Sequence, residues 1–142
     1  MIIKDTHKIS KINPNEFHAY LIYGPNEGLV RENIELIYKQ FSKTCNCEKI
    51  NLSGKQLDDD TTILQNELSS VSLFNPFKFI LLESLKEKHT EIIENVISKQ
   101  HSNACLSIKA DNLTKSSKLR RLFEVSEEHY IIPCYDDDMK SL

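Results

Sequence analysis

Two glycines between an apolar run and a helical pattern could hold phosphate. Residues 19–23 are apolar, Gly24 and Gly28 follow, and apolar residues then recur at helical spacing. Strand, glycine loop and helix are the layout of a P-loop. A working P-loop follows its second glycine with a lysine for the outer phosphates and a hydroxyl for magnesium. Here Leu29 and Val30 follow Gly28, and aliphatic side chains neither neutralise a triphosphate nor ligate a hard cation.

The same loop can be interpreted as a purely structural turn. Its amides could hold an anion at the helix N-terminus, but Glu27 lies within the loop and repels phosphate. A hydrolytic site also needs an acidic pair after a second strand, and the apolar run 79–82 leads only to Glu83 and Ser84. We therefore expect a degenerate P-loop that binds no nucleotide and no cofactor, formed by Gly24, Gly28, Leu29 and Val30.

A basic cluster is the second candidate site. It consists of Lys115, Lys118, Arg120 and Arg121, with Lys109 upstream. The cluster could contact DNA phosphates at low to moderate salt. It could also be a solvated helix face. No aromatic residues are interleaved with the basic ones, which weakens the case for DNA binding.

Metal and catalytic sites are poorly supported. The five histidines are scattered, and Asp58-Asp59-Asp60 and Asp136-Asp137-Asp138 lack the register of a calcium loop. Cys45 and Cys47 are too close together for a C-x-x-C clip. We expect four free thiols and no metal, with a disulfide or metal site as the alternative. Cys105 and Cys134 lie in apolar runs and are expected in the core.

Composition limits the class of protein. A chain of 142 residues, 39% hydrophobic and 27% charged, is typical of one globular domain. A net charge of −3 gives no global attraction to nucleic acid. There is neither an apolar run of the ~18 residues that a membrane helix needs nor a signal peptide, so we expect a cytoplasmic protein that does not enter a membrane.

The elements that would position these residues alternate along the chain. Strands are expected at 19–23, 48–52, 77–82, 105–109 and 130–134. Helices are expected at 29–42, after Asp58-Asp59-Asp60, after Thr90 and after Ser116, with these residues as caps. Residues 53–55 are expected to form a polar turn. The pattern predicts an α/β fold, a five-stranded parallel sheet flanked by helices.

Four segments together resemble a known family. They are residues 20–32, Ser72-Leu73-Phe74, residues 115–124 and residues 132–135. In order and spacing they resemble the N-terminal domain of the delta subunit of the bacterial DNA polymerase III clamp loader. The resemblance implies an ATPase-inactive AAA+-like core over residues 1–135. Residues 136–142 would be a tail, or the start of a linker to the lid and collar domains that full-length members carry.

The resemblance also implies a function, which is to bind and open the sliding clamp for loading on primed DNA. Ser72, Leu73 and Phe74 match the segment that contacts the clamp in this family. The other partners would be the loader subunits, reached through the missing domains, with the basic cluster as a further possible subunit contact. Primed DNA would be met only indirectly. As part of the polymerase holoenzyme, the chain could carry its nucleotidyltransferase label.

A Leu-Phe pair at a helix end is most often part of the core. Leu64, Leu68 and Val71 already complete the buried stripe of the preceding helix, and Leu73 and Phe74 step off it. Pro76 disfavours helix at Asn75, so we expect the pair to be exposed as a clamp-binding wedge. Two other functions stay open, a divergent P-loop ATPase or nucleotide kinase and a nucleic-acid-binding module acting through residues 115–121.

Overall fold

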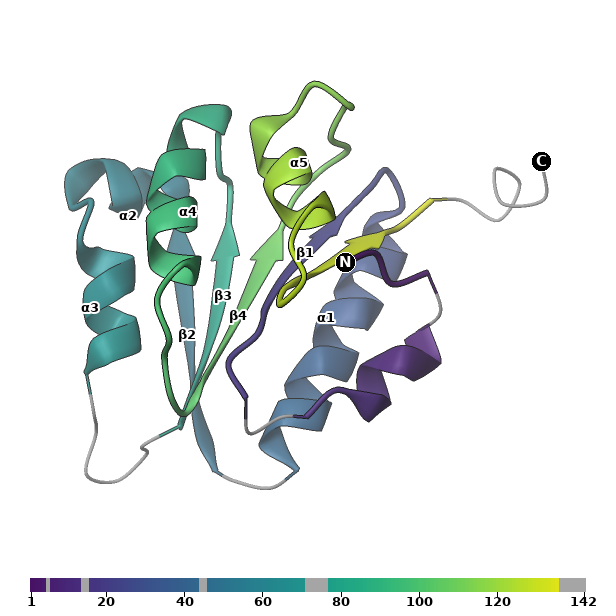
Figure 1. The fold of residues 1–142 in the computed structure, drawn as a ribbon, viewed down its shortest axis with the longest axis horizontal. Coiled ribbons are helices and arrows are strands. Elements are labelled where there is room, and N and C mark those ends of the chain that lie inside the picture. The colour runs from purple at the N-terminus through teal and green to yellow at the C-terminus, as the bar shows by residue number, and fades with distance from the viewer. Residues whose placement is uncertain (5, 14–15, 44–45, 71–76, 136–142) are drawn as a thin grey trace.

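The computed structural model describes residues 1–4, 6–13, 16–43, 46–70 and 77–135, and it contains a parallel sheet covered by helices on both faces (Figure 1). The five strands follow the order β2-β3-β4-β1-β5. Their bounds are Ala19–Tyr23 (β1), Cys47–Ser53 (β2), Phe77–Glu83 (β3), Ala104–Lys109 (β4) and Tyr130–Pro133 (β5). The predicted fold class is confirmed, and each predicted strand end lies within one residue of the observed end.

Strand β1, which lies between β4 and β5, is buried on both faces, as parallel sheets require. Its residue Tyr20 lies beside Ser107 of β4 and Tyr130 of β5. Alternate residues of β1 belong to different cores, with Leu21 on one face and Ile22 on the other, both completely buried. Strand β1 is therefore anchored in both cores.

The helices divide between the two faces (Figure 1). Helix α1 (Glu27–Ser42) and the 3₁₀ helix η1 (Thr6–Lys11) pack on one face. The other face is covered by α2 (Gly54–Asp59), α3 (Ile63–Ser69), α4 (Thr90–Ile97) and α5 (Lys118–Glu124), with the 3₁₀ turn η2 (Glu87–His89) leading into α4. The two largest fully buried side chains mark the two cores, Phe79 beneath α1 and Phe123 in α5.

Local capping explains where the helices differ from the sequence prediction. Residues 53–55 are not a turn but the start of α2, because Ser53 and Gln56 form a capping box. Asp58 and Asp59 end α2, and Asp60 does not cap α3. The Asp60 carboxylate instead accepts hydrogen bonds from Thr62 Oγ1 (2.7 Å) and Thr62 N (3.0 Å), which lower the pKa of Asp60.

Cys105 and Cys134 are buried, as predicted. Cys45 and the predicted tail 136–142 lie outside the described residues. No helix among the described ranges has the length and apolar character needed to cross a bilayer. Within those same ranges, no three His, Cys, Asp or Glu side chains gather closely enough to hold a metal ion.

Candidate functional site

The turn between β1 and α1 is only three residues long. Gly24 has φ of +139°, a conformation that side-chain-bearing residues rarely adopt, and a Cβ added there would lie 2.0 Å from Cys134 O. Helix α1 already begins at Glu27, two residues before the predicted start, because Asn26 Oδ1 accepts from Leu29 N at 3.1 Å. Gly24 is thus required by the close passage of the chain after β5.

The backbone amides of this turn are largely occupied by protein oxygens. Gly24 N donates to Asp111 O (3.3 Å) and Asn26 N to Cys134 O (3.2 Å), while Leu29 N in the first turn of α1 donates to Asn26 Oδ1 (3.1 Å). A phosphate-binding loop needs such amides free and pointing at the ligand. The spacing of the two glycines in the sequence also differs from that of a P-loop. Three residues separate Gly24 from Gly28, whereas the P-loop pattern has four between its glycines.

The residues after Gly28 are part of the hydrophobic core. Val30 is 1% exposed and packs with Ile34, Ile37 and Phe41 beneath the sheet, and Leu29 is half-buried against the same cluster. The position where a P-loop presents its magnesium-binding hydroxyl is therefore an apolar packing position.

The acid that ends β3 lies beside a cation. Glu83 Oε2 lies 4.0 Å from Lys109 Nζ at the end of the neighbouring strand β4. Ser84 follows with φ of +59°, in the left-handed region. The geometry gives Glu83 a structural partner at the place where a Walker B carboxylate would hold magnesium.

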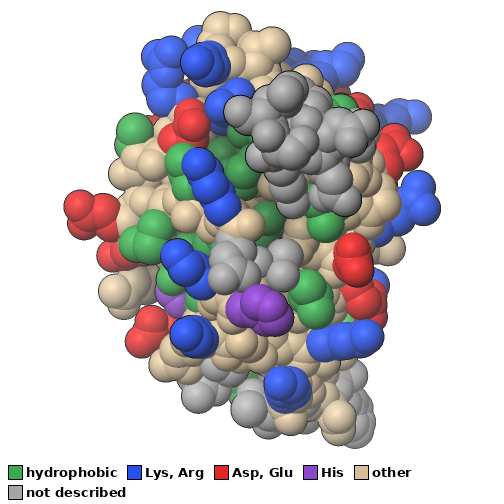
Figure 2. Space-filling model, turned by 90° about the vertical axis from the view of Figure 1, so that its right-hand side faces the viewer, with side chains coloured by type: hydrophobic (Ala, Val, Ile, Leu, Met, Phe, Trp, Pro, Cys, Tyr) green, Lys and Arg blue, Asp and Glu red, His purple; other side chains and the backbone are tan. Residues whose placement is uncertain are grey.

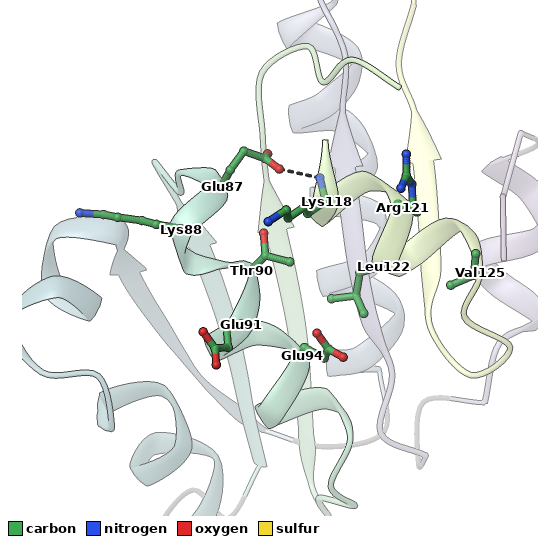
Figure 3. A pocket seen from close by; sticks show the side chains of 9 residues that line it. All are labelled: Glu87, Lys88, Thr90, Glu91, Glu94, Lys118, Arg121, Leu122 and Val125. Carbon is green, nitrogen blue, oxygen red and sulfur yellow. Dashed lines mark hydrogen bonds between the residues drawn. The ribbon is translucent and has the colours of Figure 1, made fainter. Parts of the chain in front are cut away.

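The N-terminus of α5 is closed by a carboxylate. Ser117, and not the predicted Ser116, is the N-cap and accepts from Arg120 N at 3.2 Å. Glu87 accepts hydrogen bonds from Ser117 Oγ (2.8 Å) and from Lys118 N (2.6 Å). This contact joins η2 to α5 across the sheet face (Figure 3).

The predicted basic cluster does not converge on one point. Arg120 turns inward, where its Nη1 donates to Leu113 O (2.9 Å), its Nε lies 3.5 Å from Glu124 and its guanidinium lies over the Tyr23 ring. Lys115, Lys118 and Arg121 are exposed. Figure 3 shows Lys118 extending over Thr90 while Arg121 points away from α4.

Lys118 and Arg121 line an open groove of about 640 Å³ between α4 and α5. Its other lining residues bring mixed charge and a small apolar surface: Glu87, Lys88, Thr90, Glu91, Glu94, Leu122 and Val125. On the face shown in Figure 2, Lys and Arg side chains are likewise spread among acidic and neutral ones. Neither view shows the continuous basic stripe that tracks a nucleic-acid backbone.

The predicted clamp contacts Ser72, Leu73 and Phe74 lie outside the described residues. The helix before them is described, and its Leu64 and Leu68 are buried as predicted. Lys78, just after them in β3, is 6% exposed and was not singled out from the sequence. Its signal was a lone charge inside an otherwise apolar strand, which usually means a buried partner.

Comparison with known proteins decides the family. The model of the family "DNA polymerase III, delta subunit" matches residues 20–134. The chain belongs to this family. A search of curated protein sequences found no match.

Solved structures agree on the fold. The Bacillus subtilis DNA clamp loader delta protein matches with a TM-score of 0.63 at 15% identity, over 96% of this chain and 43% of that one. A DNA polymerase III gamma subunit-related protein from Thermotoga maritima matches with a TM-score of 0.54 at 12% identity, over 96% and 46%. This delta-family chain therefore has the AAA+-like fold of clamp-loader subunits and spans less than half the length of either protein.

Proposed function

We propose that this chain is the clamp-binding domain of a DNA polymerase III delta subunit, which binds and opens the sliding clamp for loading on primed DNA. The family match over residues 20–134 carries the proposal. In this proposal residues 1–135 form the domain, and residues 136–142 are a tail or the start of a linker to lid and collar domains, through which the other loader subunits would be contacted. The protein works in the bacterial cytoplasm.

Ser72, Leu73 and Phe74 are the proposed clamp contact. Two large apolar side chains presented at a helix end can fill a preformed hydrophobic pocket on a partner, as interface anchors do. Lys115, Lys118 and Arg121 are candidate contacts with a neighbouring subunit or with DNA. Arg120 is a weaker candidate because its guanidinium is held by Leu113 and Glu124.

The domain itself is proposed to be non-catalytic, and any nucleotidyltransferase label belongs to the polymerase complex. The β1–α1 turn is interpreted as a degenerate P-loop. Supporting this, the amides of Gly24, Asn26 and Leu29 donate to oxygens of the protein, and Val30 is a core residue. Calorimetry should detect no micromolar ATP binding, with or without magnesium. Measurable magnesium-dependent phosphate release would instead support a divergent ATPase.

The deciding experiment measures binding of the 142-residue chain to the sliding clamp of the same organism. Each apolar side chain contributes roughly 1.5–3 kcal/mol when fully buried. The double variant Leu73→Ala, Phe74→Ala should therefore bind about two to four decades more weakly, with little change in melting temperature.

Two other exposed apolar residues provide matched controls for this experiment. Leu36 on α1 and Val125 after α5 are 40% and 73% exposed, and their alanine variants should bind the clamp normally. Unchanged clamp binding by the double variant, together with a large drop in melting temperature, would show that Leu73 and Phe74 belong to the core. Salt-sensitive binding of primed DNA in the absence of clamp would favour the nucleic-acid module.

A further inference from the structure

Lys78 is a buried lysine that connects two elements. It is the second residue of β3 and is 6% exposed. Its ammonium donates to Glu67 O at 3.0 Å and to Ser70 Oγ, and lies 3.4 Å from Glu67 Oε2. Its backbone N–H donates to Asn103 O at 2.9 Å, just before β4. The side chain thus reaches from the sheet to the C-terminal end of α3.

The chemistry of this contact suits a helix terminus. The last carbonyls of a helix lack intrahelical partners, and a cation placed there satisfies them and complements the helix dipole. Glu67 lies in the last turn of α3, and Ser70 is its C-cap residue. One ammonium group therefore meets a carbonyl, a hydroxyl and a carboxylate, which compensates for its removal from water.

The contact fixes two points on the chain relative to each other. Helix α3 ends at Ser69 and β3 begins at Phe77, so Lys78 joins the two elements between which residues 71–76 run. A segment whose ends are held together has fewer conformations to lose when it binds a partner. The ammonium is thus placed to affect binding by the segment that connects the two elements.

We propose that Lys78 is a positioning residue for clamp binding. Its ammonium holds the end of α3 against the start of β3 and so sets the geometry from which residues 72–74 meet the clamp. The inference rests on the proposed function, because it requires Leu73 and Phe74 to be the contact. An apolar residue could fill the same space in β3, so what the lysine adds is the tether.

The first test replaces the ammonium and keeps the apolar stem. Lys78→Met should weaken binding of the 142-residue chain to the sliding clamp about tenfold, the effect of losing one charge-assisted hydrogen bond. Lys78→Arg, which keeps the charge and the donors, should retain most of the affinity. Lys99→Met removes an exposed lysine between α4 and β4 and should leave the affinity unchanged.

A second control separates positioning from loss of stability. Ile37→Val trims a buried residue on the opposite face of the sheet, so it should lower the melting temperature without weakening clamp binding. Chymotrypsin should also cleave after Leu73 or Phe74 about tenfold faster in Lys78→Met than in Ile37→Val, by the same tenfold loss of tethering. Equal cleavage rates in the two variants would overturn the inference without reference to the clamp.

A double-mutant cycle with Leu73→Ala completes the test. If Lys78 acts through this segment, Lys78→Met should lose much of its effect on clamp affinity in the Leu73→Ala background. Fully additive effects, or an affinity of Lys78→Met equal to that of the unaltered chain, would overturn the inference alone. Failure of the unaltered chain to bind the clamp would overturn the proposed function and, with it, this inference.

Discussion

Helices α1 and α5 both begin near the carboxyl edge of the sheet. Their N-terminal backbone N–H groups are hydrogen-bonded in different ways. At α1 the closing groups are uncharged, namely the Asn26 side chain and backbone oxygens. At α5 a full negative charge, the Glu87 carboxylate, accepts from Ser117 Oγ and Lys118 N. A helix N-terminus attracts anions, so α5 is satisfied electrostatically by a residue of the same chain, whereas α1 is closed by packing and neutral hydrogen bonds.

This difference bears on the proposal that the P-loop-like turn binds no nucleotide. The α1 terminus is blocked by backbone that passes within contact distance of Gly24. Opening it would require moving the chain after β5, not merely a side chain. The N-terminus of α5 is closed by the Glu87 side chain. The contribution of this contact to the stability of the protein should therefore depend on charge and on salt concentration.

The largest effect is expected at Gly24. Gly24→Ala combines an unfavourable positive φ with a clash against Cys134 O. Backbone strain and overpacking together should lower the free energy of unfolding by about 2–6 kcal/mol. Chemical denaturation measures this directly. A loss below about 0.5 kcal/mol, the level of a neutral surface change, would mean that the turn is open and that backbone does not close the N-terminus of α1.

A smaller effect, dependent on salt, is expected at α5. Glu87→Ala leaves Lys118 N without its carboxylate acceptor and should cost about 1–2 kcal/mol of stability at low ionic strength. High salt screens exposed charge interactions, so the loss should shrink in 1 M salt. Denaturation curves at two salt concentrations test this. An equal loss of stability at both would show that the negative charge of the carboxylate does not contribute.

Asn26→Ala is the neutral counterpart of that change. Removing the cap acceptor of Leu29 N should cost about 1 kcal/mol, and the loss should be the same at low and high salt. The same denaturation series gives the answer. A salt-dependent loss here would erase the distinction between the two helix ends.

The smallest effect should be a gain. Gly28 lies in the first turn of α1, and an added Cβ would meet only Asn26 Oδ1 at an ordinary 3.6 Å. Gly28→Ala should therefore raise stability by about 0.5–1 kcal/mol by reducing the freedom of the unfolded chain. A decrease would mean that this glycine, like Gly24, is needed by the turn.

The strands were predictable because each is a short apolar run bounded by polar residues, a pattern that burial on both faces imposes. The β1–α1 layout followed from its glycines and the helical stripe of Val30, Ile34 and Ile37. Helix α2 was not predictable from periodicity, since it has only six residues and depends on the Ser53–Gln56 capping box. Its Asp58 also contacts Lys88 and His89 of η2, which are far away in the sequence.

The site was less predictable than the fold because its closing contacts join residues far apart in the chain. No local pattern connects Gly24 with Cys134, Glu87 with Lys118, or Lys78 with Ser70. The direction of Arg120, toward Leu113 and not toward solvent, likewise depends on where Tyr23 and Glu124 lie. Ser72, Leu73 and Phe74 stay a prediction.

The position of β1 has a consequence for how the protein folds. Its neighbours in the sheet are β4 and β5, which come last in the chain among the five strands of this sheet. Non-local parallel pairing delays folding, so the apolar segment 19–23 stays without its sheet partners until nearly the whole domain has been synthesised. Such unpaired apolar strands are prone to aggregate. We therefore expect C-terminal truncations that remove β5 to be insoluble rather than partly folded.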